Sequence, residues 1–491
     1  MKKRVTLIFL SLVCAAACIF GLSACKKEDG NIFKFALNDD GNSYTVTGVK
    51  LIVDNDIVIP STYNGKPVTC IGKEAFNSAY GIYTVTLPSS VTRIEERAFD
   101  DCRDLTSIEI PDSVVSIGSD AFALCRNLTS IELPDSVTSI GDEALYYCDS
   151  LKSITLPFVP EGDHSRPIGG LFGNTVPESV KTVVITGGTS IGEGAFKDCS
   201  SLESITLPST VTSIGKEAFY FCTGLTNIEL PESLERIGES AFFGCSNLTS
   251  ITVPTSVTSI SMGAFWGCTE LTSISLPFAG ESKGGTENTY FGYIFAYNSE
   301  TNGAHSNFTY VPEKLKSVVI TGDTGIAEYA FEMCVYLTSI TVMPSVTSIG
   351  KGAFLGCQCL ESITLPFVGE SKDGTENTHF GYVFGADTAN DQHPEKLPLP
   401  DMLKSVVITG GTSIEDDAFM WCDRIENITI PTSVTYIGSR AFSSCTSIRK
   451  ITYNGTKAQW KAITKRMTWN EVTLDYTVYC TDGELSKSES D

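Results

Sequence analysis

Histidine is the side chain best suited to proton chemistry near neutral pH, and this chain of 491 residues contains four of them. All four lie where a regular sequence pattern is interrupted, and several tyrosines lie there too. The histidines are His164, His305, His379 and His393, and the tyrosines are Tyr290, Tyr293, Tyr297, Tyr310 and Tyr382. Aromatic and titratable side chains on loops are typical of a partner-binding patch, so these residues are candidates for contact with a partner. The alternative is that the aromatic rings close a small core within each loop and that the histidines are ordinary loop residues.

A second group of aromatic side chains recurs at one place in the pattern, directly after an Ala-Phe or Ala-Leu pair. Its members are Tyr146, Tyr220, Phe243 and Trp266. An aromatic stripe at repeat spacing is a candidate binding track. The competing interpretation, which we favour, is that these rings pack between neighbouring units.

The sequence contains no recognisable catalytic arrangement. The patterns G-x-S-x-G, H-E-x-x-H and the phosphate-binding glycine loop do not occur. With the histidines confined to interruptions, a histidine-based triad would have to be assembled there. Acidic turns such as 38–41 and 54–56 do not complete an EF-hand pattern. We therefore predict no enzymatic activity, no cofactor and no metal site.

The elements that position these residues come from a repeat of 23 residues built around Ala-Phe-x-x-Cys. The Phe slot is occupied by Phe76, Phe99, Phe122, Leu145, Phe196, Phe219, Phe242, Phe265, Phe331, Phe354, Phe419 and Phe442. A period of about 20 to 29 residues with Leu and Ile at fixed positions indicates a leucine-rich repeat solenoid. Each unit of such a fold touches only its neighbours, so the chain grows in one dimension.

One unit, Leu128 to Cys148, predicts the local structure. Ile131 and Leu133 alternate with polar residues and form a strand of a parallel sheet, which Pro134 ends. Residues 137–141 form a second extended piece on the opposite side, closed by a turn at a glycine. Residues 142–148 then form one helical or 3₁₀ turn. The sequence predicts a strand-dominated α/β solenoid of about fifteen such coils.

Three interruptions, at about 157–179, 277–314 and 366–402, break the period. The last two resemble each other, with Phe291-Gly292-Tyr293-Ile294-Phe295 in one and Phe380-Gly381-Tyr382-Val383-Phe384 in the other. These segments echo Ile-Gly-x-x-Ala-Phe of the regular unit with one residue deleted. Each interruption is therefore predicted to be a complete coil with an enlarged, rebuilt back and no ladder cysteine. In solenoids such insertions map to one side, often the binding side.

Eleven of the 17 cysteines occupy one slot of the repeat, which Ala79 fills in the first unit. They are Cys102, Cys125, Cys148, Cys199, Cys222, Cys245, Cys268, Cys334, Cys357, Cys422 and Cys445. A slot that accepts either Ala or Cys requires a small apolar side chain, so we predict a ladder of buried free thiols. Disulfides between neighbouring coils are the main alternative.

The first 25 residues are typical of a targeting segment, with a basic start at Lys2, Lys3 and Arg4 followed by an apolar run to Phe20. The segment ends in Leu22-Ser23-Ala24-Cys25, which resembles the lipobox of bacterial lipoproteins. That resemblance implies cleavage before Cys25, lipidation of its thiol and anchoring to a membrane without spanning it. An ordinary secretory signal or a buried helix is the alternative.

The formal net charge is −23, and removal of the targeting segment would make it more negative. Because phosphate binding requires a basic face, nucleic acid is excluded as the expected partner. The consensus L-x-S-I-x-L-P-x-S-V-T-S-I-G-x-x-A-F-x-x-C resembles the BspA-like bacterial leucine-rich repeat. That resemblance implies a cell-surface protein that binds a host protein, another cell or a glycan. A passive envelope or spacer lipoprotein without a specific ligand is the alternative, and in either case we expect a monomer.

The predicted organisation has six parts. They are the lipoprotein signal peptide 1–25, a tether 26–31, a β-rich N-terminal cap 32–66, the solenoid 67–453 with its three modified coils, a mixed C-terminal cap 454–480 and a disordered tail 481–491. The N-terminal cap is expected to be a hairpin of Phe33–Leu37 and Tyr44–Leu51. The C-terminal cap is expected to have a short helix at Lys457–Lys465 and a closing strand from Val472 to Val478.

Overall fold

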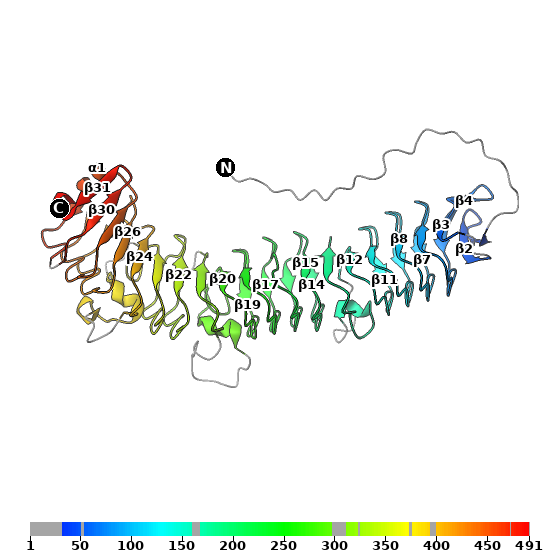
Figure 1. The fold of residues 1–491 in the computed structure, drawn as a ribbon, viewed down its shortest axis with the longest axis horizontal. Helices are drawn as coiled ribbons and strands as arrows, with labels where there is room; N and C mark the ends of the chain where they lie inside the picture. Colours follow the sequence, from blue (N-terminus) through cyan, green and yellow to red (C-terminus); the bar gives the residue numbers. More distant parts are fainter. Residues whose placement is uncertain are drawn as a thin grey trace.

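The protein forms one elongated, bow-shaped solenoid (Figure 1). The computed structural model describes residues 32–50, 54–159, 167–296, 311–322, 325–372, 376–392, 399–471 and 473–490. The coils stack in a single direction with about 17 turns and little helix, which confirms the predicted leucine-rich repeat solenoid. The predicted count of about fifteen is too low because strands of both caps continue the same stack.

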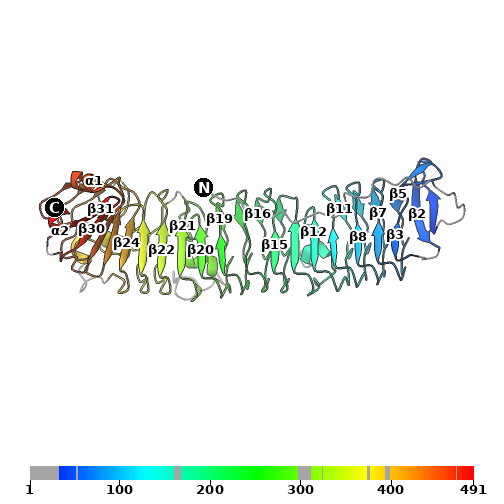
Figure 2. The same cartoon turned by 45° about the horizontal axis from the view of Figure 1, so that its top comes forward.

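The main sheet runs along the solenoid as three separately hydrogen-bonded sections in the described residues, and its strands are seen side by side in Figure 2. Its strands are β3 (Asp56–Val58), β6 (Thr84–Thr86), β8 (Ser107–Glu109), β10 (Ser130–Glu132), β12 (Ser153–Leu156), β13 (Thr182–Ile185), β15 (Ser204–Thr206), β18 (Ser250–Thr252), β20 (Ser273–Leu276), β21 (Ser317–Ile320), β22 (Ser339–Val342), β23 (Ser362–Leu365), β24 (Ser405–Ile408), β26 (Asn427–Ile430), β28 (Lys450–Tyr453) and β30 (Thr477–Cys480). Neighbours are parallel and in register, so that Ile131 pairs with Ile154 and Ile154 with Val183. The inward residues are buried, and the outward residues are mostly Ser, Thr and Glu.

Short parallel strands on the opposite side form the second predicted extended piece. They are β7 (Arg93–Ile94), β9 (Ser116–Ile117), β11 (Ser139–Ile140), β14 (Ser190–Ile191), β16 (Ser213–Ile214), β17 (Arg236–Ile237), β19 (Ser259–Ile260), β25 (Ser413–Ile414) and β27 (Tyr436–Ile437). A glycine follows most of these strands, and at several of them it is required for close packing of coils. A Cβ atom on Gly141 would lie 2.3 Å from the backbone nitrogen of Ser119 in the preceding coil.

The Ala-Phe-x-x-Cys segment, called the arm below, differs from the prediction. Regular arms are runs of turns and not helices or 3₁₀ turns. Each contains residues with left-handed backbone, such as Arg97 with φ 54° and Asp101 with φ 58°. This backbone turns alternate N–H groups toward the next coil, where Phe99 N donates to Ala121 O at 2.8 Å. The arm's hydrogen bonds therefore join coils, which a helix, with its bonds internal, would not do.

The Phe side chains of the arms form a stacked ladder through the core. Phe219 lies between Phe196 and Phe242, with ring centroids 5.3 Å and 5.1 Å away and interplanar angles of 3° and 9°. All three rings are completely buried. The coils thus contribute their inward side chains to a single continuous hydrophobic core.

The N-terminal cap is the predicted hairpin. Strands β1 (Phe33–Leu37) and β2 (Tyr44–Val49) pair antiparallel. The turn between them is held by Asp40, whose carboxylate accepts hydrogen bonds from Asn42 N and Ser43 N at 2.8 Å and 3.1 Å. Strand β2 then pairs parallel with β5 (Lys66–Ile71), which also pairs with the short strand β4 (Thr62–Tyr63). The hairpin therefore covers the first coil.

The C-terminal cap corrects two predictions. The expected helix is α1 (Lys457–Ala462), with Trp460 completely buried. It is followed by the two-residue strand β29 (Thr464–Lys465). The closing strand is β30 and lies later than predicted, with Leu474 half exposed at 52%.

The expected disordered tail is instead folded. Strand β31 (Gly483–Ser486) pairs antiparallel with β30, and the short helix α2 (Lys487–Ser490) follows. Trp460 Nε1 donates to Ser490 O at 3.2 Å, so this polar segment covers a tryptophan that the last coil leaves open. The acceptor in this contact is a backbone carbonyl, which the composition of the tail does not reveal.

We expect Phe219→Ala to destabilise the solenoid by about 3 to 5 kcal/mol, because it leaves a cavity between two stacked rings. Urea unfolding followed by circular dichroism measures the change. Thr206→Ala, on an exposed outward strand position of the same coil, is the control and should stay within about 0.5 kcal/mol. Equal effects of the two substitutions would contradict the role of the ring ladder.

Candidate functional site

The three interruptions are complete coils whose arms have been rebuilt. In each, a 3₁₀ helix takes the place of the regular arm: η1 (Pro167–Gly170), η2 (Phe291–Phe295) and η4 (Phe380–Phe384). The preceding arm donates its usual hydrogen bond to them, as Phe265 N does to Ile294 O at 2.9 Å and Phe354 N does to Val383 O at 2.9 Å. A main-sheet strand follows each one. The prediction of remodelled coils is confirmed, and we keep that name for them.

All three remodelled coils protrude from the same edge of the solenoid (Figure 1). Since their 3₁₀ helices are hydrogen bonded in line with the regular arms, the arms and the remodelled coils share one side of the molecule. We call this side the arm flank. It is the irregular surface of an otherwise uniform molecule.

The phenylalanines of the remodelled coils continue the core. Phe295 lies 6.3 Å from Phe265 on one side, and Phe291 lies 4.8 Å from Phe331 on the other. Phe384 and Phe380 bridge Phe354 and Phe419 in the same way, at 6.3 Å and 5.0 Å. The gap between neighbouring arms is wider at these two remodelled coils than in a regular stack, and two rings fill it where one ring fills the regular gap. These four phenylalanines belong to the core of the solenoid and do not close a separate small core within each loop.

The aromatic stripe is a stack on the arm flank between the first two remodelled coils. The Phe243 ring stacks on Tyr220 at 4.6 Å and on Trp266 at 4.3 Å. Lys197 Nζ lies 4.9 Å from the centre of the Tyr220 ring and extends the stack by a cation–π contact. Phe243 is only 4% exposed, so it packs between coils and is not itself accessible to a partner. Tyr220 and Trp266 are half-buried.

Tyr146 lies apart from that stack. Its ring contacts Tyr147 at 4.2 Å, and it lies beside Gly173 of the first remodelled coil, where a Cβ atom would be 3.2 Å from the tyrosine ring. The stripe inferred from the sequence is therefore two separate clusters. The cause is the first remodelled coil, which follows the Tyr146 coil directly.

Phe221, which did not enter the predicted set, is the most exposed ring of the stack. It is 41% exposed and packs edge-on against Tyr220 and Phe243 at 4.7 Å and 5.5 Å. Its ring lies over Gly244 of the next coil, where a Cβ atom would be 2.5 Å away. The sequence signal was the glycine in the same slot one coil later, which leaves room for a large ring.

Two predicted binding residues of the third remodelled coil are buried. His379 is 6% exposed and Tyr382 is 7% exposed. Both pack into the core that the 3₁₀ helix closes over itself, so neither is available for direct partner contact. In the second remodelled coil, Tyr290 and Tyr293 are half-buried. Burial and the neighbouring Glu281 carboxylate raise the pKa of Tyr293 to about 12.

The other predicted site residues lie outside the described part of the chain. They are Cys25, His164, Tyr297, His305, Tyr310 and His393. Their roles therefore stay predictions.

The ladder cysteines are free, buried thiols, as predicted. In unbroken runs each thiol donates to the carbonyl of a Phe in the preceding coil, as Cys222 Sγ does to Phe196 O at 3.0 Å. Cys199 follows a remodelled coil, and its Sγ contacts only Lys197 O at 3.8 Å among the bonds described. Burial raises the pKa of Cys245 to about 12 and of Cys222 well above its ordinary value.

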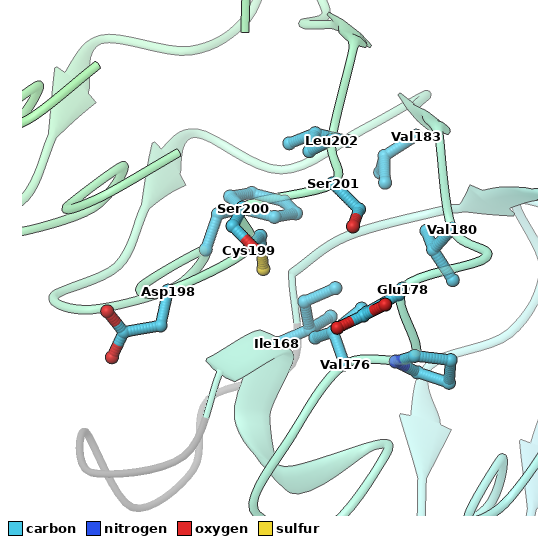
Figure 3. A pocket seen from close by; sticks show the side chains of 12 residues that line it. Ile168, Val176, Glu178, Val180, Val183, Asp198, Cys199, Ser200, Ser201 and Leu202 are labelled. Atoms are coloured by element: carbon cyan, nitrogen blue, oxygen red, sulfur yellow. The ribbon is translucent and has the colours of Figure 1, made fainter. Parts of the chain in front are cut away.

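A small hollow lies beside Cys199, where the ladder is interrupted (Figure 3). Its walls include Ile168, Val176, Glu178 and Asp198, and its volume is about 20 Å³. That space holds about one water molecule, whereas a site for a small organic ligand needs several hundred Å³. Within the described ranges no three His, Cys, Asp or Glu side chains come together in a way that would hold a metal ion. No helix there is both long and apolar enough to cross a bilayer.

The sequence profile of the BspA type leucine rich repeat region matches the chain at residues 56–160, 180–286, 304–373 and 403–471. The chain belongs to this family. It is a repeat-scaffold family whose members typically bind and do not catalyse. The matched ranges include the core strands and the regular arms, so they cover the arm flank on both sides of the remodelled coils.

Several solved structures are similar to this BspA-type chain. A leucine rich cell surface protein of Faecalibacterium prausnitzii is 30% identical over 90% of this chain and 98% of its own, with a TM-score of 0.29. A leucine-rich repeat protein of Bacteroides ovatus is 24% identical over 90% and 98%, with a TM-score of 0.34. One from T. pallidum is 30% identical over 45% and 91%, with a TM-score of 0.31. No curated protein matches.

The burial of the thiols makes a prediction for their reactivity. In the native protein at pH 8, iodoacetamide should modify Cys359, which is exposed, and leave the ladder cysteines unmodified. The thiolate is the nucleophile, and raised pKa values leave almost none of it in the ladder. Peptide mass spectrometry measures modification at each site, with urea-unfolded protein as the control in which all described thiols react. Rapid native modification of Cys222 would contradict the buried ladder.

Proposed function

We propose that this BspA-type protein is displayed on the cell surface and binds a partner protein through its arm flank, between the first and second remodelled coils. The family and the similarity to a bacterial cell surface protein support the general role. The observation that carries the proposed site is Phe221, an exposed ring seated on a stack of aromatic side chains. Large aromatic side chains on a rigid base are the most common anchors of protein interfaces.

Phe221 differs from two exposed tyrosines, Tyr80 and Tyr147, whose rings each lie under an arginine. Tyr80 carries Arg103 over its ring at 5.6 Å, and Tyr147 carries Arg126 at 5.7 Å. No such cation is recorded over Phe221 within the described ranges. Its exposed face is therefore open to a group from a partner.

The charge of the chain favours a basic protein over a glycan. The chain carries 58 acidic against 35 basic residues. This charge favours a partner with a basic surface, because opposite charge speeds encounter and penalises acidic competitors. An arginine or lysine placed over Phe221 would repeat the cation–π contacts seen at Tyr80 and Tyr147.

The proposal also places the chain on the outer side of a bacterial membrane, held by lipid on Cys25. Leu22-Ser23-Ala24-Cys25 and the basic, apolar segment before it support this step. A lipid anchor would hold the solenoid at the surface without a spanning helix. The chain would have neither a catalytic role nor a cofactor. The competing function is a passive spacer with no specific ligand.

Binding to an array of host matrix proteins, including basic ones, and to a glycan array tests the site. We expect saturable binding to a basic protein that Phe221→Ser weakens about tenfold, as the loss of one interface anchor typically does. Met333→Ser is the matched control. Met333 occupies the same slot, is 38% exposed and lies over Gly356 as Phe221 lies over Gly244, but it lies beyond the second remodelled coil.

Two outcomes would contradict the proposed site. Absence of saturable binding across both arrays would favour the spacer. An equal loss of binding affinity with Phe221→Ser and with Met333→Ser would mean that the arm flank between the first two remodelled coils is not the contact surface. Replacement of residues 279–313 by a shorter segment that restores the 23-residue period then tests whether the second remodelled coil contributes.

Cys25→Ser tests the anchor. In cells grown with a labelled fatty acid, we expect label on the unaltered protein and none on the variant. The variant should also move from the membrane fraction to the soluble or secreted fraction, because a single lost lipid attachment removes the anchor. Cys359→Ser serves as the control and should keep both label and location. Label that persists on the Cys25 variant would contradict this attachment site.

A further inference from the structure

His379 is a buried imidazole without hydrogen-bond partners. It lies directly before helix η4 in extended backbone, with φ −97°, and is 6% exposed. Within the described structure neither Nδ1 nor Nε2 has a hydrogen-bond partner. A neutral imidazole has one donor and one acceptor, and a protonated one has two donors, so protonation adds a donor to a site whose described groups do not satisfy the neutral ring.

The surroundings of His379 contain carboxylates that already have other partners. Asp387 follows η4 and forms an ion pair with Lys351. Asp391, in the 3₁₀ helix η5 (Ala389–Gln392), accepts a hydrogen bond from Thr388 N at 3.1 Å.

Two further titratable groups face the imidazole. Asp417, in the arm of the next coil, pairs with Arg440 at 2.8 Å. The Tyr382 ring approaches edge-on, with its centre 6.2 Å from that of the imidazole. Burial lowers the pKa of His379, and the opposing attraction of Asp391, Asp387 and Asp417 does not overcome it.

The second remodelled coil contains the same arrangement without a titratable imidazole. Tyr290 takes the place of His379, before Phe-Gly-Tyr-Ile-Phe instead of Phe-Gly-Tyr-Val-Phe. Its ring lies 6.0 Å from Tyr293 at an angle of 89°, whereas His379 lies 6.2 Å from Tyr382 at 89°. The packing at this position therefore accepts a phenol. A histidine is therefore not needed to fill this position, and what it adds is a group that can be protonated.

We propose that the third remodelled coil is an acid-sensitive element, in which protonation of His379 releases the segment Phe380–Gln392 from the arm flank. Burial disfavours an imidazolium here even though the Asp387 backbone is close enough to favour the charge, whereas in the released segment water solvates it. If the arm flank binds a partner as proposed above, acidification changes the shape of that surface at its third remodelled coil. The release itself does not depend on the proposed function.

The direction of the pH dependence follows from the two states. In the closed coil His379 is neutral, and in the released segment it has an ordinary imidazole pKa of about 6.5. Only the released state therefore gains a proton as the pH falls below that value. The equilibrium constant for release should rise about tenfold per pH unit below about 6.5, until the lowered pKa of the closed state is reached.

Hydrogen–deuterium exchange of the full chain, without any partner, tests the proposal at pH 5.5 and 7.5. Rates in peptides from residues 376–392 are corrected for the intrinsic pH dependence of exchange. We expect opening of this segment to be about tenfold more frequent at pH 5.5 in the unaltered protein. His379→Tyr, which copies the second remodelled coil, should abolish the difference. Peptides from residues 287–296 should respond to pH in neither protein.

His379→Gln is a second variant, polar and not titratable, in case a phenol fits the third coil less well than the second. Equal corrected exchange at the two pH values in the unaltered protein would overturn the proposal. So would an acid response that survives in both variants, because another group would then be responsible. Since no partner is present, failure here and failure of the proposed binding function are separate results.

Discussion

Every part of this molecule depends on the burial of one coil against the next. A single coil has an apolar interior but no second layer to cover it, so only the stack is stable. Three sets of contacts hold the stack: in-register strand pairs such as Ile131 with Ile154, the ring ladder through Phe219, and arm hydrogen bonds such as Phe99 to Ala121. All three repeat with the same period, and any change in coil length must preserve all three.

The remodelled coils show how that constraint is met when the period changes. Their strands remain in register, as Ser273 with Ser317 shows across the longest interruption. The arm hydrogen bond is also kept, with Ile294 O in place of a regular Ala carbonyl. In the second and third remodelled coils the ring ladder changes, from one phenylalanine to two. Extra length is therefore confined to the arm flank, where it can vary without disturbing the sheet.

The interruptions disturb the regular contacts of residues in and next to the remodelled coils. Cys199 follows a remodelled coil and does not donate to a Phe carbonyl as Cys222 does, and the small hollow of Figure 3 lies there. The third remodelled coil holds His379 with no hydrogen-bond partner in the described structure. Features that could respond to a partner or to pH thus occur where the repeat is broken. In regular coils many polar groups repeat the same hydrogen bond one coil away, as the Thr106 and Thr129 side chains do to Tyr83 O and Thr106 O.

The sequence by itself determined the solenoid, its sheet, the Phe and Cys ladders and the nature of the interruptions. These follow from a period of 23 residues in which each slot repeats the same side-chain type, and stacking turns a sequence repeat directly into a spatial one. The N-terminal hairpin could also be predicted, from a turn-forming cluster between two alternating segments.

Only the tertiary structure decided the rest, because it depends on contacts that have no period. The arms are turns and not helices since their N–H groups bond to the next coil, which one unit's sequence does not show. The polar tail is folded because Trp460 needs a cover. Phe243, His379 and Tyr382 have residue types found at binding sites, yet the surrounding structure buries them. Phe221 is exposed, because Gly244 beneath its ring has no side chain that could cover it. Residue type and spacing identified the flank, but which of its side chains reach the surface depends on what the next coil places against them.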